Sequence, residues 1–455
     1  MIRPIEPSES LMHKALLLST LGCVTLACSG DSAGIASVDS AFTEVGTVLR
    51  VSWTLDAQGE SWVSFGPEED CERFQTHRTP GETGEVLLVG LPTVTDSCFT
   101  LHAEIDGTAH TWPTEFFRTG NAPAVFEDPD VESLQPEAFE DGFLLGNNPL
   151  SNNTLYMLNR EGQFVWWHQG PEGYGNARMI LASDKQSVFY NEFNIDFSID
   201  SSRVVEVGLD GVEKNSTFTP NGHHGFEILE DGTLAYLAID VREVEGLGTV
   251  VGDTLMLDDG SGPVALYSTW DDPQLIVEAH DNWDSPFYPQ GHDWTHANYV
   301  EYSKERDSFL ISFTNIHTLV EIDAQSGEHL RSIGHYGTYD IDESLIRRPH
   351  TGSWTPEGTI LVFTTPEGTE ESIALELALD EENQSASTIW SYGEGLERYS
   401  HILGEAKRLE NGNTLVNFGS KGIVEEVNTE GEVLWRFLTT TGVLPGHVSL
   451  LKSFY

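Results

Sequence analysis

Three short stretches decide the fold: Glu230-Asp231-Gly232-Thr233-Leu234, Pro356-Glu357-Gly358-Thr359-Ile360 and Glu410-Asn411-Gly412-Asn413-Thr414-Leu415. In each, a turn with glycine separates two apolar stretches of alternating pattern, which is typical of a β-hairpin. A companion form of this turn occurs at residues 161–166, 326–328 and 430–435. Repeats of roughly 40–50 residues with four strands each indicate a β-propeller. We therefore expect six blades over residues 142–455, with an insertion at 240–290.

The register of these turns brings three histidines into one group. The residues eight positions before the three turn glycines are His224, His350 and Gly404. His296 has a similar place before its own strand, although the turn after that strand lacks glycine. Equivalent positions of different blades form a ring around the propeller axis, so we expect the three histidines to converge at one mouth of the channel. The alternative is that each histidine only caps the turn of its own blade.

The residues before the repeats predict a separate all-β domain. Between residues 33 and 120, short alternating runs are separated by Gly, Pro and Asp at the spacing of a β-sandwich, and the segment resembles a fibronectin type III module. Residues 121–141 combine three prolines with several acids and are interpreted as a linker.

The charge of the chain limits its partners. Of 455 residues, 73 are Asp or Glu and 23 are Lys or Arg, so the formal net charge is −50. A chain this acidic has no basic patch to neutralise phosphates, which argues against a nucleic-acid partner, and an anionic lipid surface would repel it. Hydrophobic residues make up 39% of the chain and aromatic residues 10%, too many for a disordered acidic protein.

The first 28 residues predict a lipoprotein signal peptide. The apolar run Ala15–Ala27 is too short to span a bilayer, and Thr25-Leu26-Ala27-Cys28 resembles a bacterial lipobox. We expect translation to start at Met12 and Cys28 to be lipidated. The protein would then be exported and anchored to a bacterial membrane, in the periplasm or at the cell surface. Ser29 in place of Asp after the cysteine favours the outer membrane, and a cleaved signal without lipid is the alternative.

Cys71 and Cys98 are the cysteines that remain after residue 28. Because an exported chain meets an oxidising environment, we expect them to form a disulfide. Two buried free thiols are the alternative.

The sequence HDWTHAN at residues 292–298 resembles the HDWxHxN motif of the bacterial arylsulfate sulfotransferases. Residues 350–363 resemble the segment around the catalytic histidine of that family, and the resemblance extends over about 142–455. It implies a β-sandwich followed by a six-bladed propeller, and transfer of a sulfuryl group from an aryl sulfate donor to a phenolic acceptor without a cofactor. His350 matches the histidine that becomes sulfated. His224, His296 and Asn298 match residues that hold the sulfuryl oxygens.

This chemistry is reasonable from first principles. Neutral imidazole is a good nucleophile near neutral pH, since its ordinary pKa is about 6.5. Neighbouring hydrogen-bond donors stabilise the charge on a sulfuryl group in transfer. The sequence contains no P-loop motif, so a nucleotide sulfate donor is not indicated.

One position departs from the family. Thr314 stands where the family has an arginine that binds the sulfuryl group, and threonine cannot replace a forked cation. Arg178 and Lys421 lie near the starts of other blades and are candidates to compensate, although a solvated surface position is favoured for each. His292 is a further auxiliary candidate.

Two other functions compete with sulfuryl transfer. One is a non-catalytic, surface-anchored propeller that binds a ligand or a protein. The other is metal binding by His292, Asp293 and His296, but a zinc site needs three or more ligands in tetrahedral geometry, and spacing alone does not establish that. We expect no metal.

Overall fold

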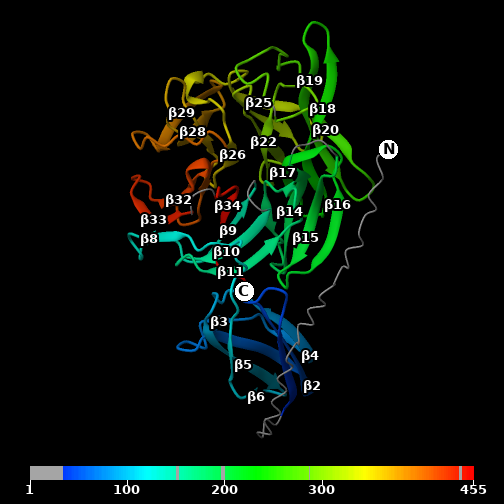
Figure 1. The fold of residues 1–455 in the computed structure, drawn as a ribbon, viewed down its shortest axis with the longest axis vertical. Coiled ribbons are helices and arrows are strands. Elements are labelled where there is room, and N and C mark those ends of the chain that lie inside the picture. Colours follow the sequence, from blue (N-terminus) through cyan, green and yellow to red (C-terminus); the bar gives the residue numbers. More distant parts are fainter. Residues whose placement is uncertain (1–33, 150–152, 196–199, 286, 440–442) are drawn as a thin grey trace, which may run out of the picture.

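The computed structural model describes residues 34–149, 153–195, 200–285, 287–439 and 443–455. The predicted signal peptide and Cys28 lie outside the described residues. Within these ranges the protein is built from β-strands, with two single-turn 3₁₀ helices, Glu343–Leu345 and Gly419–Lys421. Figure 1 shows the N-terminal strands in blue as a separate body below the larger ring of blades. None of the helices in the described ranges is long and apolar enough to cross a membrane.

The N-terminal body contains seven strands. They are β1 (Ile35–Phe42), β2 (Leu49–Pro67), β3 (Phe74–Gln75), β4 (Thr79–Leu88), β5 (Asp96–Ile105), β6 (Thr108–Thr111) and β7 (Glu115–Arg118). The long strand β2 pairs with β1, β3, β4 and β5, so all seven strands join into one sheet. The apolar side chains of this sheet, among them Trp53, Phe65 and Phe99, form one core. The fibronectin-type arrangement of two sheets stays a prediction.

The predicted disulfide is confirmed. Cys71 lies in the turn after β2 and Cys98 lies in β5, and their sulfurs are bonded with the Cα atoms 5.5 Å apart.

The described residues from 143 onward form six sheets of four or more strands, which confirms the six-bladed propeller. Blade one contains β34 (Val448–Leu451), β9 (Phe143–Asn148), β10 (Thr154–Asn159) and β11 (Phe164–Gln169). Blade two contains β12 (Tyr174–Gly175), β13 (Met179–Leu181), β14 (Ser187–Asn194), β15 (Arg203–Gly208) and β16 (Glu213–Phe218). Blade three contains β17 (Gly222–Ile228), β18 (Leu234–Val244), β19 (Gly248–Asp258), β20 (Val264–Ser268) and β21 (His292–Asp293). Blade four contains β22 (Ala297–Ser303), β23 (Ser308–Phe313), β24 (Thr318–Asp323) and β25 (His329–Gly334). Blade five contains β26 (Thr351–Trp354), β27 (Ile360–Thr364), β28 (Ile373–Asp380) and β29 (Ser385–Tyr392). Blade six contains β30 (Glu405–Arg408), β31 (Thr414–Phe418), β32 (Ile423–Val427), β33 (Val433–Leu438) and β8 (Asp130–Ser133).

The turn glycines lie where the sequence predicts them. Gly232, Gly358 and Gly412 each connect the first strand of a blade to the second and have φ of 88°, 80° and 88°. A residue with a Cβ is strained in this left-handed region, which explains why glycine occupies the turn. The same hairpin therefore recurs in blades three, five and six.

The last strand closes the ring. β34 pairs antiparallel with β9, so blade one combines the end of the propeller sequence with its beginning. The pairing joins Val448–Leu451 to Phe143–Gly146.

Two segments differ from the sequence-based expectation. Residues 121–141 are not a plain linker, because β8 pairs with β33 as a fifth strand of blade six, and Phe126 packs on Phe164 and Trp167 of blade one. The edge of β33 offers unpaired backbone groups, which this strand satisfies. The proposed insertion 240–290 contains the end of β18 and the whole of β19 and β20, so the added length is the long β18–β19 hairpin and the loop after β20 (Figure 1).

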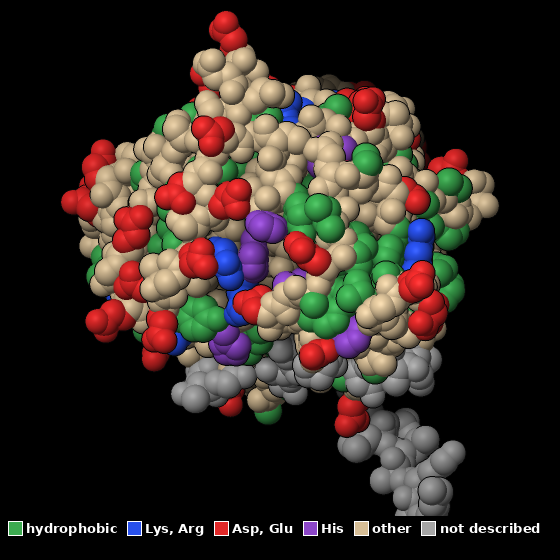
Figure 2. All heavy atoms as spheres, turned by 90° about the horizontal axis from the view of Figure 1, so that it is seen from above, with side chains coloured by type: hydrophobic (Ala, Val, Ile, Leu, Met, Phe, Trp, Pro, Cys, Tyr) green, Lys and Arg blue, Asp and Glu red, His purple; other side chains and the backbone are tan. Residues whose placement is uncertain are grey.

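The surface carries the excess acid. In Figure 2 the acidic side chains are spread over the face that is seen from above, and Lys and Arg are few among them.

Candidate active site

The starts of the innermost strands of the blades form a ring of polar side chains. His224 lies in β17, His296 and Asn298 lie at the start of β22, and His350 directly precedes β26. The rings of His224 and His296 are 5.0 Å apart. A cavity of about 40 Å³, which can hold a few water molecules or one small anionic group, lies next to this ring. The lining includes Arg178, His224, Asn298, His350, Gly404, Glu405 and His447.

His350 has a defined tautomer. Its Nδ1 lies 2.9 Å from the carbonyl oxygen of Gly404. Because a carbonyl can only accept, Nδ1 carries the hydrogen and Nε2 keeps the lone pair. Burial lowers the pKa of His350 to about 4, so the ring is neutral near pH 7. Nε2 of His350 is therefore a nucleophilic nitrogen next to the cavity.

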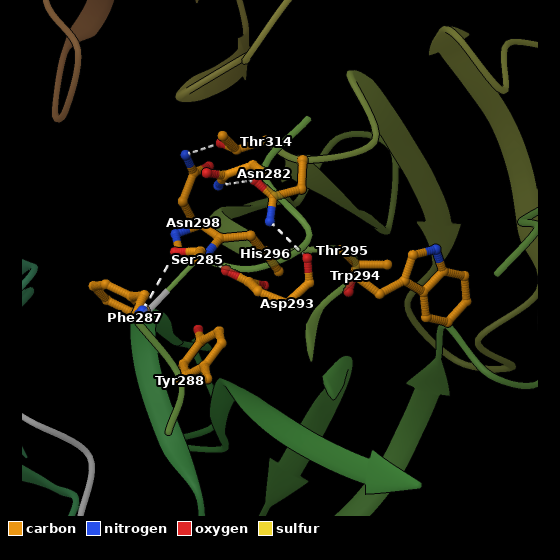
Figure 3. A network of polar contacts seen from close by, with 12 residues as sticks. Asn282, Ser285, Phe287, Tyr288, Asp293, Trp294, Thr295, His296, Asn298 and Thr314 are labelled. Carbon is orange, nitrogen blue, oxygen red and sulfur yellow. Dashed lines mark hydrogen bonds and ion pairs between the residues drawn. The ribbon is translucent and has the colours of Figure 1, made fainter. Parts of the chain in front are cut away.

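His296 is held by a carboxylate. Its Nδ1 lies 2.7 Å from Oδ2 of Asp293, which is fully buried. Burial alone would lower the pKa of His296, but the negative charge of Asp293 outweighs it and raises the pKa above its usual value. Figure 3 shows His296 between Asp293 and the side chains of Phe287 and Tyr288. His296 is therefore suited to donate hydrogen bonds to an anion.

The backbone is strained at His224 and at His296. His224 has φ of 36° and His296 has φ of 50°, and the strand pairing is irregular beside each of them. Such conformations cost on the order of 1–3 kcal/mol each and persist where the surrounding structure imposes them. The resulting bulges turn both rings toward each other instead of leaving them in the alternating pattern of a strand.

His224 is kept neutral by its neighbours. Burial lowers its pKa well below the usual value, and the nearby histidines 296, 223 and 350 lower it further. Its Nδ1 lies 3.0 Å from Nδ1 of His223, whose Nε2 lies 3.0 Å from Oδ1 of Asp253. Asp253 also accepts hydrogen bonds from Thr295 and from the amide of Ala297. This buried carboxylate fixes both the histidine pair and the start of β22.

Thr314 occupies the side of the site where the sequence departs from the family. Its hydroxyl donates to the carbonyl oxygen of Pro349 at 2.8 Å and accepts from the amide nitrogen of Asn298 (Figure 3). Oδ1 of Asn298 is buried without a hydrogen-bond partner. Thr314 thus connects two segments of the site but brings no charge to it.

The auxiliary candidates lie in three different environments. Arg178 lines the cavity and is buried, which corrects its interpretation as a surface residue; it pairs with Glu227 at 2.7 Å and lies over the ring of Tyr299. Lys421 is exposed, and the cavity lining does not include it. His292 is paired with Asp284 at 2.8 Å and stacks on Trp283. Of the three, Arg178 alone reaches the cavity.

Sequence reasoning missed two residues of the cavity, His447 and Glu405. His447 directly precedes β34, the innermost strand of blade one, so it has the same place in its blade as His350 has in blade five. No glycine turn follows β34, because the next strand of that blade lies some 300 residues earlier in the sequence. The usable signal was the closure itself, which aligns residue 447 with the other strand starts.

The described residues contain no group of three His, Cys, Asp or Glu side chains arranged to hold a metal ion. Of the three proposed metal ligands, His296 and Asp293 pair with each other, whereas His292 pairs with Asp284 instead.

Comparison with solved structures finds matches of low similarity. A protein of unknown function from Bacteroides caccae is 15% identical, with a TM-score of 0.44, and the match covers 69% of this chain and all of that one. A putative 6-phosphogluconolactonase from Bacteroides uniformis is 12% identical, with a TM-score of 0.42, over 86% and 99% of the two chains. The periplasmic gluconolactonase of Pseudomonas aeruginosa is 11% identical, with a TM-score of 0.40, over 69% and 99%. No curated protein sequence matches the chain.

The family comparison is more informative. The model of the arylsulfotransferase (ASST) family matches residues 130–339 and 351–441, which is more than half of the chain, and His350 lies in the interval between the two parts. The match includes β8 and every strand of the six blades except β34, together with His224, His296 and Asn298. The chain belongs to the arylsulfotransferase family.

Proposed function

We propose that the protein transfers a sulfuryl group from an aryl sulfate to a phenol through a covalent intermediate on His350. The observation that carries the proposal is the hydrogen bond from Nδ1 of His350 to Gly404, because it leaves the lone pair of Nε2 at a cavity with His224 and Asn298 in its lining. The family assignment supports the same chemistry.

The reaction has two half-reactions. In the first, Nε2 of His350 attacks the sulfur, the N–S bond forms, and the bond from sulfur to the aryl oxygen breaks as the phenolate leaves with the electron pair. In the second, the oxygen of the acceptor phenol attacks the sulfur while its proton passes to a base, the N–S bond breaks, and His350 regains its lone pair. His296, with its raised pKa, His224 and Asn298 are the groups proposed to hold the sulfuryl oxygens.

The replacement of arginine by Thr314 weakens the anion site in this scheme. Threonine has no charge, and its hydroxyl is already occupied by Pro349 and Asn298. Arg178 supplies a buried cation at the same cavity, but Glu227 neutralises part of its charge. We therefore expect turnover with a weak affinity for the donor.

The sulfated intermediate can be observed directly. Incubation of the purified protein with p-nitrophenyl sulfate in the absence of an acceptor should release one equivalent of nitrophenolate and add the mass of one SO₃ to the peptide that contains His350. His350→Ala should abolish both signals, and His335→Ala, which changes an exposed histidine, should retain them. A folded wild-type protein without adduct or turnover would contradict the proposal and favour the non-catalytic binding of a ligand or protein.

Thr314→Arg tests the missing cation. If the anion site is the weak point, the added guanidinium should lower the KM for p-nitrophenyl sulfate and raise turnover. Thr314→Lys, which adds a charge without the fork, should gain less. An unchanged or higher KM in both variants would mean that the loss of arginine accompanies a different substrate.

We also propose that the protein is exported and anchored to a bacterial membrane through lipidated Cys28, with the outer membrane favoured. The lipobox-like sequence Thr25-Leu26-Ala27-Cys28 supports this proposal. Cys28→Ala should move the protein from the membrane fraction to the soluble fraction without changing its activity. A variant that still sediments with membranes would contradict the anchor.

A further inference from the structure

A second buried imidazole lies at the cavity of His350. Nδ1 of His447 is 2.8 Å from Oε1 of Glu405, and the two side chains are 9% and 4% exposed. The other carboxylate oxygen, Oε2, accepts a hydrogen bond of 2.7 Å from the amide of Val448, so the carboxylate is fixed at both ends. Both residues line the same cavity as His350.

One dipeptide orients both imidazoles. The carbonyl of Gly404 accepts from Nδ1 of His350, and the carboxylate of the next residue, Glu405, accepts from Nδ1 of His447. Each ring therefore carries its hydrogen on Nδ1 and its lone pair on Nε2. The strand β30 begins at Glu405, so the dipeptide lies at the start of the blade that separates the two histidines.

We propose that His447 is the base that removes the proton from the acceptor phenol, with Glu405 as its positioning residue. This rests on the proposed sulfuryl transfer. In the second half-reaction the O–H bond of the phenol breaks, its proton goes to Nε2 of His447, and its oxygen forms the bond to sulfur. The N–S bond breaks toward His350. The proton then leaves His447 for the phenolate released earlier or for solvent, so no further reactant is needed.

The surrounding charges separate His447 from the other histidines. Burial lowers the pKa of His447, the charge of Glu405 opposes this, and Arg178 and Lys407 lower it further, so the ring is neutral near pH 7 and can accept a proton. The pKa of His296 moves in the opposite direction because of Asp293. Two imidazoles whose environments move their pKa values apart are suited to different roles, a base and a hydrogen-bond donor.

His447→Gln tests this role, because glutamine keeps a hydrogen-bond donor for Glu405 but cannot act as a base. The donor is p-nitrophenyl sulfate, and the acceptors are phenol, which is un-ionised near neutral pH, and pentafluorophenol, which is ionised. The sulfated products are quantified by mass spectrometry. We expect a loss of about 100-fold or more in kcat/KM for phenol, in the range of general-base catalysis, and a change of only a few fold for pentafluorophenol. The first release of nitrophenolate should stay intact.

Three outcomes are decisive. Equal losses for both acceptors, or no loss for phenol, would overturn the role of His447 while the sulfated His350 would still support the proposed function. The absence of any nitrophenolate release from the wild type would refute the proposed function and this inference with it. Glu405→Gln should give a smaller loss that is again confined to phenol, and the pH at which activity with phenol falls should move.

A matched control is available outside the cavity. His329 has the same kind of partner, since its Nδ1 lies 2.6 Å from Asp272 and the side chains are 7% and 1% exposed. His329→Gln removes a buried imidazole paired with a carboxylate, so it reports what such a loss does to the fold alone. We expect it to affect the two acceptors equally. A preference between acceptors in this control would overturn the interpretation of His447→Gln.

Discussion

At His350 a backbone carbonyl decides which ring nitrogen can react. Gly404 accepts from Nδ1, and the lone pair therefore remains on Nε2 at the cavity. The side chain of residue 404 takes no part in this contact. In fact Gly404 has φ of 133°, and an added Cβ would lie 2.2 Å from the ring of Phe363. The glycine allows the chain to pass this ring closely and bring its carbonyl to the nucleophile.

Acidification should destabilise the protein through His350. Its folded pKa is about 4, below the usual value of about 6.5, so the unfolded chain binds the proton first and stability is lost as the pH falls between these values. By about pH 5 the loss from this group is at most about 2 kcal/mol. Urea unfolding of wild type and His350→Gln near pH 7 and pH 5 measures it, and the variant should lose less stability on acidification. Equal losses would contradict the lowered pKa.

How far the sequence predicts the site depends on whether a residue follows the repeat. His224 and His350 share a fixed distance from a turn glycine, and that register predicted their common ring. His447 lies in the closing strand, where no such turn exists, and the sequence alone does not align it with the other blades. Arg178 was interpreted as a surface residue because charge favours solvent, but Glu227 and the ring of Tyr299 stabilise it in the interior. Partners distant in sequence therefore account for what was missed.

Among the strands, short segments from outside the repeats complete the sheets. The six blades follow from alternating patterns and glycine turns, which are local features that a sequence displays. β8 lies in a proline-containing acidic segment, and its pairing with β33 depends on an open edge some 300 residues away. For this reason the repeating blades could be predicted, and the fifth strand of blade six could not.

The disulfide is expected to stabilise the N-terminal sheet. It joins the turn after β2 to β5 across a sequence separation of 27 residues. Closing a loop of this length reduces the entropy of the unfolded chain, which corresponds to about 3–4 kcal/mol. Cys71→Ser with Cys98→Ala should lower the unfolding free energy of the N-terminal transition by that amount, and with it the denaturant midpoint, and leave the propeller transition unchanged. A midpoint equal to that of the wild type would contradict the expectation.

The junction of blades one and six depends on one buried ion pair. Arg160 and Glu426 are 2% and 0% exposed and lie 2.5 Å apart, and Arg160 also lies over the ring of Trp435. Arg160→Leu leaves the carboxylate buried without its cation, which should cost about 3–5 kcal/mol in thermal or urea unfolding. The double variant with Glu426→Leu should recover part of this loss. Arg118→Leu, which breaks an exposed pair with Asp96, is the control and should cost less than about 1 kcal/mol.

The net negative charge of the whole molecule opposes its folding. The chain carries 73 acidic and 23 basic residues, and Figure 2 shows acidic side chains spread over the face in view. Like charges at the surface repel each other and oppose the compact state. Pairs such as Arg398 with Glu425 and Arg408 with Glu376 place some of the few cations inside the propeller.

Salt should therefore stabilise the protein. Sodium chloride screens the surface repulsion, and because the screening length is already about 10 Å at 0.1 M, most of the gain should occur below about 0.2 M. The thermal midpoint measured from a few millimolar to 0.5 M salt gives the curve. Sucrose at matched osmolality is the control, since it leaves charges unscreened. A flat or falling curve below about 0.2 M would contradict the importance of self-repulsion.

The pairing of β34 with β9 also determines when, during synthesis, the propeller ring can close and the cavity can form. A ribosome produces the chain from its N-terminus, so β9 is synthesised early. Its edge stays unpaired while five further blades are synthesised, until β34 pairs with it. His447 directly precedes the strand that covers this edge. A nascent or prematurely stopped chain that ends before β34 would thus lack both the closed ring and His447 at the cavity. Assembly of the site therefore requires synthesis to have passed Leu451.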